Sequence, residues 1–60
     1  MNIPKDPYML LSFVNTQLRD NYSSLADLAS SYGVAPEEIR EKLKAAGYEY
    51  DEANNAFINS

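Results

Sequence analysis

The order of apolar and polar residues in the first third of the chain predicts a helix over residues 7–21. Asp6 is suited to cap its N-terminus, and Pro7 fits the first helical position because the N–H that proline lacks has no partner there. One group of apolar residues repeats at helical spacing and is expected to face the core. Its members are Leu10, Leu11, Val14 and Leu18.

A second apolar stripe gives this helix an apolar face that is wider than one small core needs. It consists of Met9 and Phe13, about 100° round the helix from the first stripe. Polar residues are expected to form the solvent-facing side, and they are Asn15, Gln17, Arg19 and Asp20. In a dimer, one stripe would face the core and the other the partner. We therefore take Tyr8, Met9 and Phe13 as the candidate self-association residues.

Two shorter helices are predicted at residues 25–32 and 36–46. Ser24 is a suitable N-cap for the first, and Gly33 is suited to end it in the left-handed conformation. Pro36 fits the first position of the second. Apolar residues at helical spacing are expected to be buried, and they are Leu25, Leu28, Ala29, Tyr32, Ile39, Leu43 and Ala46.

The last part of the chain changes from helical spacing to alternation. Residues 48–51 alternate apolar and polar side chains, and Phe57 and Ile58 repeat the pattern after an asparagine-rich segment. This order predicts a short β-hairpin over residues 48–58. Two strands alone are marginally stable, so the hairpin is expected to pack on the helices.

The second and third predicted helices resemble a helix-turn-helix unit. Ala29 is small where the two helices would cross, and Gly33 allows the positive φ that reverses the chain. The hairpin stands where a small wing would follow such a unit. We therefore expect a mainly α fold, with one domain over residues 1–60 that joins a three-helix, helix-turn-helix-like unit to a short C-terminal hairpin.

A DNA-binding helix-turn-helix regulator is the alternative function that this resemblance implies. Arg40 and Lys44, one turn apart on the third helix, are its candidate DNA contacts, and Arg19 and Lys42 would have to line the same face. However, glutamates at residues 37–38 occupy the turn that would approach the bases, where they would repel the phosphates.

Charge weighs against nucleic acid as the partner. The chain has 5 Lys+Arg and 9 Asp+Glu, which gives a net charge of −4. This balance opposes bulk electrostatic capture of nucleic acid or of an anionic membrane. Arg40 and Lys44 also have a simpler expected role, which is ion pairing with Glu37 and Glu41 on their own helix.

The residue inventory predicts neither catalysis nor a cofactor. The chain has no His and no Cys, so it lacks the usual zinc ligands, an imidazole base and a thiolate nucleophile. It also has no glycine-rich phosphate loop. The N-terminus has no signal stretch, and the longest apolar run, residues 8–11, is far too short for a membrane span. We expect a cytoplasmic protein without metal or cofactor.

The Asp-Pro-Tyr-Met-Leu-Leu-Ser run at residues 6–12 resembles the start of a family of short bacterial proteins catalogued as a domain of unknown function. The resemblance extends through the segment at residues 47–51 to Phe57. It implies a stand-alone cytoplasmic bacterial protein and supplies no activity, ligand or catalytic residue. We expect a non-enzymatic interaction module whose partner is a second copy of itself, bound through the first helix, or another protein. Self-association would add stability to a chain of this size, which is marginally stable alone.

Overall fold

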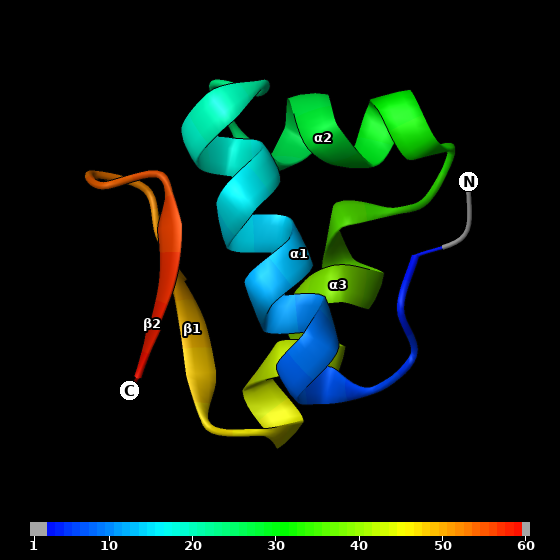
Figure 1. Ribbon diagram of the computed structural model, residues 1–60, viewed down its shortest axis with the longest axis vertical. Coiled ribbons are helices and arrows are strands. Elements are labelled where there is room, and N and C mark those ends of the chain that lie inside the picture. Colours follow the sequence, from blue (N-terminus) through cyan, green and yellow to red (C-terminus); the bar gives the residue numbers. More distant parts are fainter. Residues whose placement is uncertain (1–2, 60) are drawn as a thin grey trace.

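The computed structural model describes residues 3–59 and folds them into three helices followed by two strands (Figure 1). The elements are α1 (Pro7–Asp20), α2 (Leu25–Tyr32), α3 (Pro36–Ala45), β1 (Tyr48–Asp51) and β2 (Ala56–Asn59). The predicted mainly α class with a C-terminal hairpin is therefore confirmed. Asn21 and Ala46 are the C-caps of α1 and α3, so each helix ends one residue before its predicted limit. Residues 1, 2 and 60 of the predicted domain lie outside the described residues.

Side chains at the predicted caps hold the first two helices. An Asp6 carboxylate oxygen accepts a hydrogen bond from the Met9 N–H at 3.0 Å. The Ser24 hydroxyl oxygen accepts one from the Asp27 N–H at 3.1 Å. Each bond satisfies a donor that has no partner within the helix. Gly33 ends α2 at φ 70°, which is the left-handed conformation predicted for it.

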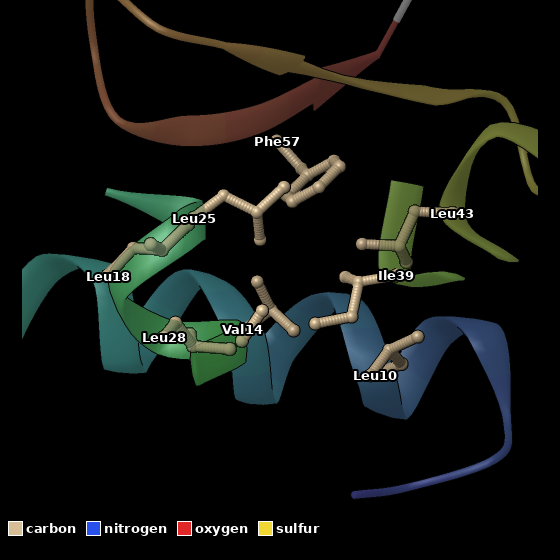
Figure 2. Packing of buried hydrophobic residues seen from close by; sticks show 9 residues of the cluster. Leu10, Val14, Leu18, Leu25, Leu28, Ile39, Leu43 and Phe57 are labelled. Atoms are coloured by element: carbon tan, nitrogen blue, oxygen red, sulfur yellow. The ribbon is translucent and has the colours of Figure 1, made fainter. Parts of the chain in front are cut away.

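One apolar core lies between the helices and the inner face of the hairpin (Figure 2). Within residues 3–59 its buried members are Leu10, Val14, Leu18, Leu25, Leu28, Ala29, Ile39, Leu43 and Phe57. Every helix contributes most of the helically spaced apolar residues expected of it. Leu11, Tyr32 and Ala46 were expected in the core but are only half-buried. Leu11 and Tyr32 pack against the edge of the core, and Ala46 is the C-cap that follows α3.

The hairpin closes the core from the side. In Figure 1, α2 crosses the upper end of α1, α3 passes behind α1, and the hairpin stands at the left. β1 packs against α3 and β2 packs against α1. The two strands are antiparallel, with Glu49 opposite Ile58 and Tyr50 opposite Phe57.

Two asparagines attach the hairpin to α1. The Asn15 side chain donates to the Phe57 carbonyl at 3.1 Å and accepts from the Phe57 N–H at 2.8 Å. The Asn55 amide donates to the carbonyls of Leu18, at 3.1 Å, and Tyr22, at 2.9 Å. The placement of Asn15 on the solvent-facing side of the first helix was therefore wrong. It is half-buried because β2 covers that side of α1.

Candidate functional site

The start of α1 exposes two large apolar side chains next to each other. Tyr8 is 64% exposed and Met9 is 63% exposed. Pro7 and the Asp6 cap begin α1 here, so the two side chains project from its first turn. Among the large apolar side chains of residues 3–59, Ile58 on β2 is the other exposed one, at 49%. We call Tyr8 and Met9 the α1 patch.

Phe13, the third candidate self-association residue, has a partner inside the molecule. Its ring meets that of Tyr32 edge to face, with 5.6 Å between centroids, and Tyr32 meets Tyr22 in the same way at 6.2 Å. Phe13 is half-buried as a result. Burial raises the pKa of Tyr32, and the neighbouring Tyr22 phenol raises it further. Phe13 is thus more buried than the two residues of the α1 patch.

The two candidate DNA contacts lie in a groove between α3 and β1. The groove has a volume of about 450 Å³. Its lining residues are Glu37, Arg40, Glu41, Lys44, Tyr48, Glu49 and Tyr50. Arg40 and Lys44 therefore share this groove with the carboxylates of Glu37, Glu41 and Glu49. Phosphates entering it would meet more negative than positive side chains.

Arg40 makes its contacts across this groove rather than along its helix. Its guanidinium lies 3.8 Å from a Glu52 carboxylate oxygen and 5.5 Å from the centre of the Tyr50 ring. Within residues 3–59, the ion pairs are this one and Arg19–Asp20. The expected pairing of Arg40 and Lys44 with glutamates of α3 is therefore not formed. Arg40 pairs instead with Glu52, which the hairpin brings to it.

The remaining cations named for DNA binding do not join this groove. Arg19 lines a second hollow of about 650 Å³, between α1 and the hairpin turn. Its guanidinium binds Asp20 at 2.9 Å, and this hydrogen bond lowers the pKa of the Asp20 carboxyl. Lys42 lines neither hollow. The four cations thus do not converge on one surface.

Three polar residues that hold the hairpin were not identified from the sequence. They are Asn15, Tyr50 and Asn55. The Tyr50 hydroxyl donates to the Asn55 side-chain oxygen at 2.6 Å and accepts from the Leu25 N–H, the first of α2, at 3.2 Å. The asparagine-rich turn indicated a hairpin, but the pattern did not indicate which backbone groups its amides would bind. Within residues 3–59, no group of three or more acidic side chains is placed to hold a metal ion, and no helix is long and apolar enough to cross a bilayer.

Comparison with known proteins gives one result. A family model described as Domain of unknown function (DUF4250) matches residues 4–57. Neither the curated proteins nor the solved structures contain a significant match. The matched range contains the three helices, β1, and β2 as far as Phe57, so it includes both the α1 patch and the groove between α3 and β1.

Proposed function

The chain belongs to the family described as Domain of unknown function (DUF4250), and we propose that it is a non-enzymatic interaction module that forms a homodimer through the α1 patch. The observation that carries this proposal is the pair of exposed apolar side chains, Tyr8 and Met9, on the first turn of a capped helix. The lack of cysteine and the resemblance to short bacterial proteins support action in a bacterial cytoplasm.

A two-fold dimer is the simplest way to cover the patch. In such a dimer the same surface contributes from both copies, so an apolar patch meets an apolar patch. Tyr8 and Met9 together offer roughly 300 Å² of surface. This is well below the roughly 800 Å² per partner of a standard interface. We therefore infer a weak dimer, with a dissociation constant on the order of 100 µM.

Phe13 has a supporting part in this proposal. It follows Met9 by one helical turn, so its exposed edge borders the patch. Its ring already contacts Tyr32 edge to face, and its side chain is half-buried. Phe13 therefore widens the apolar margin of the interface without being its centre.

The charge distribution favours a protein partner over DNA. The net charge is −4, and the groove that holds Arg40 and Lys44 also holds three carboxylates. A protein that reads DNA first needs cations that converge on phosphates. The α1 patch needs only a second apolar surface.

Light scattering on a size-exclusion column tests the proposal with two matched variants. Met9→Lys places a charge in the patch, whereas Ile58→Lys places the same charge on an exposed apolar residue of β2. We expect Met9→Lys to elute as a monomer at concentrations where the unmodified chain and Ile58→Lys contain dimer. Equal loss of dimer in both variants would contradict the assignment to α1. A salt-sensitive gel shift of duplex DNA that Arg40→Gln abolishes would favour the alternative function.

A further inference from the structure

The outer edges of the two strands differ in whether their backbone N–H and C=O groups have hydrogen-bond partners. Phe57 uses its N–H and C=O to bind Asn15, so these groups point away from β1. Both backbone groups of a strand residue point to the same side, and facing residues of an antiparallel pair alternate between bonded and non-bonded. Tyr50, which faces Phe57, therefore directs its own N–H and C=O away from β2.

Tyr48 lies two residues before Tyr50 and directs its backbone groups to the same side. On that side, neither tyrosine has a backbone hydrogen-bond partner within residues 3–59. The outer edge of β1 is thus open at Tyr48 and Tyr50, whereas Asn15 occupies the outer edge of β2 at Phe57. An open edge of this kind is a template for pairing with another strand.

The open edge borders the groove between α3 and β1. Tyr48, Glu49 and Tyr50 form one wall of this groove and α3 forms the other. We propose that the groove binds an extended basic segment of another protein, which adds as a strand to β1. Main-chain hydrogen bonds to Tyr48 and Tyr50 would hold the segment, as in other cases of strand addition.

Charge selects a basic segment. The carboxylates of Glu37, Glu41 and Glu49 line the groove. Arg40 lies beside Glu52, which leaves Lys44 as the groove cation without a carboxylate in ion-pair contact among the described residues. Lysine or arginine at alternate positions of an added strand would place positive charge along the groove.

A second copy of β1 fits this edge poorly. If two copies of β1 paired antiparallel along their open edges, two registers would each pair three residues of one copy with three of the other. One register is centred on Glu49 and the other on Tyr50. The first places Glu49 opposite its own equivalent, and the second places Glu49 opposite Asp51. Like charges directly opposite each other destabilise a strand pair. The occupant is therefore a different chain, and the groove is separate from the α1 patch.

An NMR titration of the Met9→Lys variant tests the proposal without interference from the α1 patch. The probe is a short, end-blocked peptide of alternating lysine and valine. We expect the amide hydrogens of Tyr48 and Tyr50 to become protected from exchange on binding, while the Glu49 and Ile58 amides change little. The same peptide methylated on every backbone nitrogen should not bind, because neither of its edges then has a donor for the open edge of β1.

Two charge reversals on α3 provide the matched control. Glu41 lines the groove, and Glu38 is exposed on the same helix outside it. We expect Glu41→Lys to raise the dissociation constant by roughly three- to tenfold and Glu38→Lys to change it by less than about twofold. The proposal is wrong if the folded protein does not bind the peptide, if the methylated peptide binds equally well, or if both reversals weaken binding alike. Protection of the edge by added unlabelled protein instead of the peptide would assign it to a second copy and overturn the proposal.

Discussion

The side chain of Asn15 binds both backbone groups of Phe57, which lies forty-two residues away in the chain. The amide acts as a short substitute for a neighbouring strand, because it offers one donor and one acceptor at the spacing of a peptide group. It thereby covers the outer edge of β2 at Phe57 and fixes the hairpin against α1. Phe57 reaches the core from this position.

Replacing Asn15 by alanine should destabilise the protein more than its half-buried position suggests. The change leaves the N–H and the carbonyl of Phe57 without their partner, and each unsatisfied group costs about 1–3 kcal/mol. We expect the free energy of unfolding to fall by about 2 kcal/mol in urea titrations. Thr16→Ala, on the exposed neighbour, should change it by less than about 0.5 kcal/mol. Equal effects of the two variants would show that the Asn15 contact contributes little.

The hydroxyl of Tyr50 should contribute to stability in a way that the hydroxyl of Tyr48 does not. The Tyr50 hydroxyl bonds the first N–H of α2 and the Asn55 side chain. Tyr50→Phe should lower the free energy of unfolding by about 1–2 kcal/mol. Tyr48→Phe is the matched control on the same strand and should have little effect. The comparison is made by thermal unfolding followed by circular dichroism, and no difference between the variants would contradict this assignment.

The helices could be predicted because their signals are local. Capping by Asp6 and Ser24 and the left-handed Gly33 each depend on residues within one turn, and the apolar stripes follow from helical spacing alone. Contacts between residues that are far apart in the sequence were harder to predict. Asn15 looks like a solvent-facing residue in a helical pattern, and only its partner on β2 shows otherwise. Arg40 likewise has glutamates at helical spacing, yet it binds Glu52 because the hairpin folds back toward α3.

Gly33 should tolerate asparagine better than alanine. Its φ of 70° lies in the left-handed region, but a Cβ added there would meet no atom within 4 Å. The penalty therefore arises from the backbone alone. We expect Gly33→Ala to cost about 1 kcal/mol, or roughly 4–8 °C in melting temperature. Gly33→Asn should cost less, because asparagine adopts this conformation more readily. Equal losses from the two substitutions would indicate a different cause.

Tyr32 should make the protein less stable at alkaline pH. Burial raises its pKa above the ordinary value of 10.0, so the unfolded chain loses the proton before the folded one. The contribution of Tyr32 to the free energy of unfolding is fully present below pH 10.0 and is lost as pH rises through its folded-state pKa. The free energy of unfolding, measured in urea titrations from neutral to alkaline pH, should decline more steeply for the unmodified chain than for Tyr32→Phe. Parallel declines would contradict this linkage.

Sedimentation equilibrium of the unmodified chain tests the proposed self-association most directly. The measurement covers roughly 10 µM to 1 mM, on both sides of the expected dissociation constant. We predict that the weight-average mass rises reversibly from 6.7 kDa toward twice that value and returns to it on dilution. A mass that stays at 6.7 kDa over the whole range would contradict the homodimer and leave Tyr8 and Met9 without the partner that we propose.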